Sequence, residues 1–358
     1  MLNFSDNLAQ IDKSNMRDIL QGFPRQCEEA VKMGKEIVLP SSFKDRTIEK
    51  VLICGLGGSA IGGDILRTLF SSQKVMITVN RNYHLPSFVD SNTLLFIVSY
   101  SGNTEETLSC FKDAIKNKYL LFSISSGGEL EKLSKENKVP HLRVPGGMPP
   151  RCAVGYITIP MVILLERVLN VELFDYRELV EVISMLSEKY SPDSKDNDNF
   201  VKSTAIKLKG KIPLIYGVDA LTDVVAHRLK TQFNENSKIH AIWDVLPEMN
   251  HNEVVPWSGE GKVNLEIFFP IFIRDKKEDE RIARRIEITK GLIEKKGVEF
   301  CEIWTKGDSP LTRIFSSIYT GDWISFYLAL AQGVDPTPIV FIDLLKNELK
   351  KIKDGGNE

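Results

Sequence analysis

The chain has 358 residues and a formal net charge of −2 at pH 7. Its length allows two domains of ordinary size, and its near-neutral charge gives no reason to expect a nucleic-acid partner or an anionic membrane surface. The cysteines are odd in number and form no Cys-x-x-Cys pair, which favours the reducing cytoplasm and neither a disulfide framework nor a zinc site. We expect no targeting segment and no membrane span, because the first residues lack a basic-then-apolar pattern and no apolar run is long enough.

Apolar strand-like runs alternate with helical patterns over the first half of the chain. Such alternation predicts βαβ units, and therefore a parallel sheet with helices on both faces. The expected strands are 51–54, 75–79, 93–98, 119–124 and 139–144, and the helices expected after them are 154–169 and 177–189.

A glycine-rich loop follows the first of these strands. The segment Gly55–Asp64 contains Gly-x-Gly-x-x-Ala, the outline of a dinucleotide-binding fingerprint, and leads into a helix expected over Ile65–Leu69. The next strand ends at Arg81 with no acidic residue to hold a ribose, although an arginine there can receive a 2′-phosphate. The loop is therefore a candidate phosphate site through Gly58 and Ser59, or a glycine turn that serves only close helix packing.

The most informative segment is Ser99–Thr107, which follows a strand and opens a helix expected over 104–118. The hydroxyls of Ser99, Ser101 and Thr104 can donate hydrogen bonds, and the free N–H groups of the helix start favour an anion. An ordinary helix cap is the alternative. Two such loops at adjacent strand ends favour a small phosphorylated ligand held between them.

The second half repeats the alternation after a polar linker at 191–199. Strands are expected at 212–216, 264–273 and 298–303, and helices at 219–233, 277–296, 309–332 and 338–352. The charges from Arg274 to Lys296 alternate in sign at helical spacing and predict a solvated helix face. Since this half lacks both phosphate-type loops, we expect two tandem α/β domains, 1–190 and 200–358. The first would hold phosphate, and the second would contribute chemistry.

Four residues outside the two loops are candidates for chemistry, and each has a plainer alternative. Arg151 follows a proline loop at the end of the fifth strand, where ligands bind in such sheets, or it pairs there with a carboxylate. His251 lies between two asparagines that can fix its tautomer, or it belongs to an ordinary surface turn. Glu235 at a helix end and Lys346 on the amphipathic C-terminal helix would, by position alone, be solvated surface groups.

Together, the motifs resemble those of a known family. The two loops resemble the sugar-isomerase (SIS) fold, and three further stretches resemble the bifunctional phosphoglucose/phosphomannose isomerases of archaea and some bacteria. These stretches are Pro150–Gly155, Phe233–Lys238 and Pro247–Glu253. The matching motifs extend from about Gly55 to Lys346. They depart from the family at Cys152-Ala153-Val154, where small residues and leucine are more common, and we expect that departure to affect packing only.

The resemblance implies two SIS-type domains, each a mainly parallel sheet flanked by helices. It also implies an aldose–ketose isomerase that interconverts glucose 6-phosphate and mannose 6-phosphate with fructose 6-phosphate through a cis-enediol. Glu235 would be the base, Lys346 a ring-opening group with Lys350 as its alternative, and His251 and Arg151 further members of the site. The residues expected to bind substrate are Gly58, Ser59, Ser99, Ser101, Thr104 and Arg151.

The resemblance implies no cofactor and no metal, because the reaction needs a base, a proton donor and a cation. It implies a homodimer in which the histidine loop, Pro247–Ser258, reaches into the neighbour's site, with neither a nucleic-acid nor a membrane partner. A sugar-phosphate sensor of the same fold is the alternative function. Such a sensor would keep the phosphate loops but would not need Glu235, His251 and Arg151 together.

Overall fold

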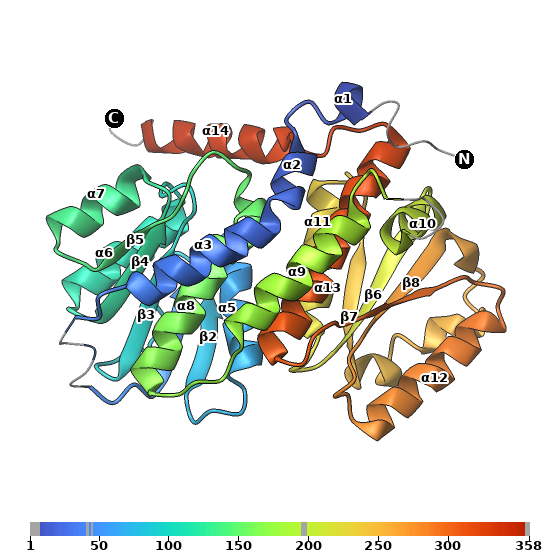
Figure 1. Cartoon of the computed structure of the whole chain (residues 1–358), viewed down its shortest axis with the longest axis horizontal. Helices are drawn as coiled ribbons and strands as arrows, with labels where there is room; N and C mark the ends of the chain where they lie inside the picture. The colour runs from blue at the N-terminus through green and yellow to red at the C-terminus, as the bar shows by residue number, and fades with distance from the viewer. Residues whose placement is uncertain (1–7, 41–42, 44–45, 195–198, 355–358) are drawn as a thin grey trace.

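The computed structural model describes residues 8–40, 43, 46–194 and 199–354, which form two parallel sheets. The first sheet has the order β2-β1-β3-β4-β5 and the second the order β7-β6-β8-β9, with every pair of neighbouring strands parallel. Figure 1 shows the two sheets in separate halves of the molecule with helices packed around them. The predicted α/β fold with two sheet-based halves is confirmed.

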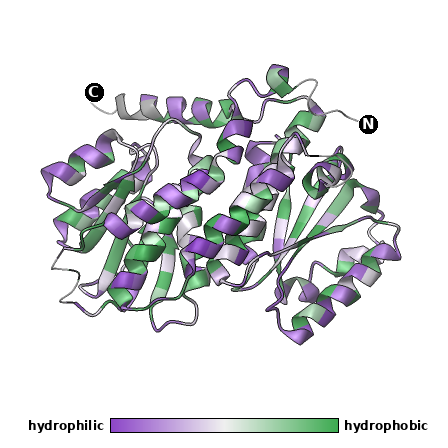
Figure 2. Cartoon of the chain, in the orientation of Figure 1, coloured by the Kyte–Doolittle hydropathy of each residue, from purple (hydrophilic) through white to green (hydrophobic). Residues whose placement is uncertain are grey.

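The first sheet is built from β1 (Lys50–Cys54), β2 (Met76–Asn80), β3 (Thr93–Val98), β4 (Leu120–Ser125) and β5 (His141–Arg143). Strands β3 and β4 are buried at every position, because helices cover both faces of the sheet. Figure 2 shows the hydrophobic residues concentrated along these strands. One face packs against α5 (Gly58–Leu69) and α8 (Val154–Leu169), and the other packs against α6 (Glu105–Lys116) and α7 (Gly128–Glu136).

The second sheet is built from β6 (Ile212–Val218), β7 (Ile242–Leu246), β8 (Phe268–Arg274) and β9 (Cys301–Trp304). Helix α12 (Glu280–Glu294) covers one face. The other face packs against α10 (Phe200–Leu208), α11 (Asp223–Glu235) and α13 (Pro310–Gln332). Helix α13 is buried along almost its whole length, which explains why its sequence carries no continuous polar stripe.

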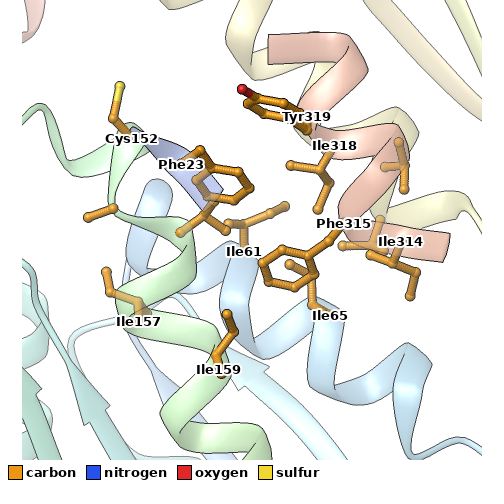
Figure 3. Packing of buried hydrophobic residues seen from close by; sticks show 14 of the residues in the cluster. Phe23, Ile61, Ile65, Cys152, Ile157, Ile159, Ile314, Phe315, Ile318 and Tyr319 are labelled. Atoms are coloured by element: carbon orange, nitrogen blue, oxygen red, sulfur yellow. The ribbon is translucent and has the colours of Figure 1, made fainter. Parts of the chain in front are cut away.

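The two halves share one hydrophobic core around α13. Figure 3 shows Ile314 and Phe315 of α13 close to Ile61 and Ile65 of α5. The remaining helices of the first half are α1 (Leu8–Ile11), α2 (Met16–Gln21), α3 (Phe23–Glu36) and α9 (Tyr176–Tyr190). The Phe23 ring of α3 stacks on Tyr319 of α13 with 5.2 Å between ring centroids. This shared core fixes the position of one sheet relative to the other.

Several predicted elements of the first half are confirmed, and one needs correction. Strand β3 and helix α8 have the predicted bounds, 93–98 and 154–169. Helix α5, however, begins at Gly58 and not at Ile65. A Cβ on Gly63 would lie 2.9 Å from the Cβ of Ile53, so the glycines belong to the helix and allow its close approach to the sheet.

The second half departs further from the prediction. The strand predicted at 264–273 is wrong at its start, because Leu265–Ile267 is a 3₁₀ helix and β8 begins at Phe268. Strand β7 and helix α10 were not predicted. Helix α10 starts where the Asn199 side chain accepts a hydrogen bond from the Lys202 N–H. Residues 195–198 of the predicted linker lie outside the described residues.

The predicted solvated charges of 274–296 need correction at Arg274. Its side chain is 4% exposed, and its guanidinium bonds to Glu278, to Glu287 at 2.8 Å and to Glu302. It also lies 4.6 Å above the ring of Trp304, the geometry of a cation–π contact. Arg274 ends a buried strand and cannot share the solvated face of the helix that follows it.

Gly102, in the loop after β3, is the glycine whose replacement should cost most stability. Its φ of +71° is left-handed, and a Cβ there would lie 1.8 Å from the Gly127 carbonyl oxygen. We expect Gly102→Ala to lose about 1–2 kcal/mol through the backbone conformation and roughly 1–3 kcal/mol more through the clash. Denaturant unfolding measures the loss.

Gly333→Ala is the matched control for this substitution. Gly333 has almost the same φ, +72°, and no atom within 4 Å of an added Cβ. It should lose only the conformational part, about 1–2 kcal/mol. Equal losses in the two variants would show that the loop moves away from Gly127 without cost.

Candidate functional site

The two loops singled out in the sequence meet at the switch point of the first sheet. In the strand order 2-1-3-4-5, the connections from β1 and β3 leave in opposite directions, and a crevice opens at the carboxyl ends of these two strands. The loop Gly55–Gly57 leads from β1 into α5, and the loop Ser99–Thr104 leads from β3 into α6. Two helix N-termini therefore start beside one crevice, where an anion is favoured.

The hydroxyls at the two loops divide into those that bond within the chain as donors or lie buried, and those that are open to a ligand. Ser99 is fully buried, and its Oγ donates to the Thr104 Oγ1 at 2.9 Å. Ser59 is 5% exposed, and its Oγ accepts from the Tyr100 N–H at 3.1 Å. Ser101 is exposed and Thr104 half-buried. Both accept hydrogen bonds within the chain, Ser101 from the Asn103 N–H, so the proton of each hydroxyl is available to a ligand.

Arg151 lies against the start of α5. It belongs to the short 3₁₀ helix η1 (Pro150–Cys152), and a Cβ on Gly58 would come within 3.0 Å of the Arg151 Cα. The side chain is 2% exposed. Its guanidinium donates to the Asn236 Oδ1 at 2.7 Å and to the Glu235 Oε2 at 3.3 Å. Two further bonds of 2.9 Å go to the carbonyls of residues 336 and 337.

Glu235 is the last residue of α11 and brings a carboxylate of the second half to this crevice. Its carboxylate is 25% exposed, so it contacts Arg151 and also remains open to a ligand. Arg67 near the end of α5 pairs with Asp223 at the start of α11 at 3.1 Å. The end of α5 is thus paired with the start of α11, and Arg151, which lies against the start of α5, is paired with Glu235 at the end of α11. The two helices therefore run antiparallel.

His251 does not reach Glu235 within one chain. It is the last residue of the 3₁₀ helix η3 (Glu248–His251), which directly follows β7. This helix lies at the carboxyl ends of the strands of the second sheet, the same side from which α11 starts. Its neighbour Asn250 bonds to Thr289 of α12, on the face opposite α11. The thirteen residues of α11 span about 20 Å at 1.5 Å per residue, so Glu235 and His251 lie at opposite ends of the second half.

Lys346 makes no hydrogen bond or ion pair with Glu235, Arg151 or the two loops in the part of the chain that the structure describes. It is exposed on α14 (Val340–Asp354), which crosses above the first half in Figure 1. The chain leading into α14 starts at the site, because Arg151 holds the carbonyls of Pro336 and Thr337. The alternative lysine, Lys350, has no described side chain.

Lys238 is a residue of this site that the sequence did not single out. Its ammonium donates to the carbonyl of Glu235 and, at 3.1 Å, to that of Pro336, which Arg151 also holds. Partial burial, and then the charge of Arg151, lower the pKa of Lys238 to about 8. The sequence carried a signal for Lys238: it lies shortly after the end of a predicted helix, and helix C-termini favour positive charge.

The accessible hydroxyls give the first binding prediction for this site. Ser101→Ala and Thr104→Val should each weaken binding of a phosphorylated sugar by about 1.5–3 kcal/mol, the value of a hydrogen bond to a charged group. Titration of each variant with the sugar phosphate measures the loss, and inorganic phosphate should compete in the wild type. Ser203→Ala, at an exposed serine of α10, is the control. Normal binding by both loop variants would make the loop a helix cap.

The described residues include neither a metal-ligand cluster nor a membrane-spanning helix. No group of three or more His, Cys, Asp or Glu side chains among them is placed to hold a metal ion. None of the described helices combines the length and apolarity that crossing a membrane requires.

Comparison with known proteins places the chain in a family. Residues 197–349 match the family described as the bacterial phospho-glucose isomerase C-terminal SIS domain. A bifunctional phosphoglucose/phosphomannose isomerase from Caldicellulosiruptor bescii is 40% identical over 95% of this chain and 100% of its own length. A protein of the same name from Thermoplasma acidophilum is 36% identical over 90% of this chain and 96% of its own.

Solved structures agree on the fold. A hypothetical protein from Thermus thermophilus superimposes with a TM-score of 0.75 at 14% identity, covering 98% of this chain and 96% of that one. At this identity, the likeness concerns the fold alone. The sequence relatives decide the family, since their identity of 36–40% extends over nearly the whole chain. This chain belongs to the bifunctional phosphoglucose/phosphomannose isomerases.

Proposed function

We propose that this protein interconverts fructose 6-phosphate with both glucose 6-phosphate and mannose 6-phosphate through a cis-enediol. The observation that carries the proposal is the Glu235 carboxylate, 3.3 Å from the Arg151 guanidinium beside the two phosphate-type loops. A sugar-phosphate sensor needs the loops but not a carboxylate and a buried arginine at the same crevice. The isomerase relatives support the catalytic alternative.

The first half binds the phosphate group in this proposal. Ser101 and Thr104 donate hydroxyl protons to it, and the free N–H groups at the starts of α5 and α6 add a favourable field. Ser59 and Ser99 act through the shape of the loops, because their hydroxyls are already engaged within the chain. Gly58 lets the α5 start lie against Arg151, so that the phosphate end and the reacting end of the sugar are held together.

Glu235 and Arg151 carry the proton transfer. The carboxylate removes the proton from C2 of an open-chain aldose, and the same carboxyl returns it to C1; a proton also passes from the C2 hydroxyl to O1, which gives the ketose. The oxygen that becomes negative in the enediolate is stabilised by the Arg151 cation. Glucose 6-phosphate and mannose 6-phosphate differ only at C2, so both collapse to the same enediol, and one base serves both epimers.

Ring opening is assigned to His251 and Lys346, with His251 supplied by a second copy of the chain. The length of α11, about 20 Å, supports this assignment, because within one chain Glu235 ends α11 and the 3₁₀ helix that carries His251 lies at the edge of the sheet where α11 starts. A homodimer would also cover apolar side chains that α14 leaves in solvent, such as Phe341 at 84% and Leu345 at 60% exposure.

The expected domain division and cellular location complete the proposal. We divide the chain into a phosphate-binding region, 1–190, a linker, 191–199, and a region with the base and the histidine loop, 200–358. The family match from residue 197 supports a boundary near this linker. Five free cysteines suit the reducing cytoplasm.

A coupled assay tests the proposed function. Fructose 6-phosphate should yield both aldose phosphates, each detected with its own coupling enzyme, and the activity should survive exhaustive chelation, because a carboxylate and an arginine supply what the reaction needs. Binding of sugar phosphate without turnover would favour the sensor. Loss of activity after chelation, restored by zinc, would contradict the metal-independent mechanism.

A further inference from the structure

One stripe of α11 connects the buried helix α13 to Arg151. Arg228 and Gln232 of α11 and Asn236, the residue that caps its end, follow one another at intervals of four residues, so their side chains lie on the same side of the helix. All three are at most 2% exposed. Each bonds to a polar group of α13, and two of them also bond to Arg151.

The first connection runs through a buried ion pair. The Arg228 Nη2 donates to the Asp322 Oδ2 at 2.7 Å and to the main-chain carbonyl of Arg151 at 2.9 Å. The Gln232 Nε2 donates to the other Asp322 oxygen at 2.9 Å. Asp322 is 4% exposed. Arg228 therefore fixes the backbone from which the Arg151 side chain starts.

The second connection runs through Asn236. Its Oδ1 accepts from the Arg151 Nε at 2.7 Å, and its Nδ2 donates to the Ser325 Oγ at 3.0 Å. Ser325 in turn donates to the Asp322 carbonyl at 2.7 Å and, through its own carbonyl, accepts from the Ser237 hydroxyl. Asn236 therefore fixes the plane of the Arg151 guanidinium. Asn236 is itself held by Ser325, which bonds to Asp322, the residue that also holds Arg228.

We propose that Asp322 and Ser325 are positioning residues for the isomerisation, acting on Arg151 through Arg228 and Asn236. The proposal rests on the proposed function, in which Arg151 stabilises the enediolate. A buried ion pair contributes little net stability compared with well-packed apolar residues. The Arg228–Asp322 pair is instead useful because it fixes a position. The Arg151 guanidinium bridges the two halves, and a small displacement of a catalytic group lowers the rate strongly.

Kinetics of Asp322→Asn test the proposal. The change keeps the shape of the side chain but weakens its hold on Arg228, so kcat should fall on the order of ten- to a hundredfold. The KM for fructose 6-phosphate should stay within about twofold, because the phosphate loops are untouched. Since the effect passes through Arg151, adding Asp322→Asn to an Arg151→Lys background should lower kcat by much less than it does in the wild type.

Asp275→Asn is the matched control. The Arg313–Asp275 pair is equally buried, with side chains 8% and 2% exposed and a distance of 2.9 Å, and Arg313 lies on the same helix as Asp322. This variant should lose comparable stability in denaturant unfolding and keep a normal kcat. Equal kcat losses in the two variants would reduce Asp322 to a structural role.

Ser325→Ala keeps the test decisive if Asp322→Asn fails to fold. It removes only the hydroxyl that holds Asn236, and it should lower kcat several-fold with little change in KM. A normal kcat in Ser325→Ala, or in a folded Asp322→Asn, would overturn the positioning role. That failure is distinct from failure of the proposed function, in which the wild-type protein itself would not convert fructose 6-phosphate.

Discussion

Replacing Glu235 with glutamine is expected to lower kcat at least about a hundredfold, the low end of the contribution of a general base. The amide keeps the shape of the side chain and can still bond to Arg151, but it cannot accept the proton from C2. Substrate affinity should change little, because the loops proposed to bind the phosphate lie on the other half of the chain. Steady-state rates in both directions, together with a titration of substrate binding, measure the two effects separately.

Glu253→Gln is the control for this prediction. Glu253 accepts a hydrogen bond from the Tyr216 hydroxyl at 3.0 Å and is only partly exposed, but it lies in the histidine loop and not at the end of α11. It should keep a nearly normal kcat. If Glu235→Gln were active and Glu253→Gln or Glu248→Gln inactive, the base would lie on the histidine loop.

The loops of this site were predictable because their signals are local. A strand, a run of glycines or hydroxyls, and a helix start follow one another within about ten residues, and such order specifies the position of the loop at a sheet edge. Only the structure, however, distinguishes the hydroxyls that face solvent from those that are buried. Ser99 and Ser101 look alike in the sequence, but the first is fully buried and the second exposed.

The partners of Arg151 were not predictable from the sequence. Glu235 is 84 positions away, and Pro336 is 185 positions away. They meet Arg151 only because α5 and α11 pack antiparallel around the shared core. Strand β7 was missed for a related reason: it is an edge strand, exposed at Ile242 and Trp243, without the regular alternation that marks a half-buried strand.

The separation of Glu235 from His251 gives the second large prediction. Glu235→Gln and His251→Ala should each be nearly inactive alone. After the two variants are unfolded, mixed in equal amounts and refolded, about half of the molecules should be mixed dimers by random pairing in a two-fold assembly. Each mixed dimer would hold one doubly defective pocket and one intact pocket. The mixture should therefore recover about a quarter of wild-type activity.

A second mixture provides the control, because Glu235 and Arg151 contact each other within one chain. Every pocket of a dimer formed from Glu235→Gln and Arg151→Ala lacks one of the two groups. This mixture should stay inactive under the conditions that revive the first. Native mass spectrometry establishes that subunits exchange in both. If the first mixture exchanges and still shows no activity, His251 acts within its own chain or has no part in the reaction, because a pocket shared between copies would have been restored.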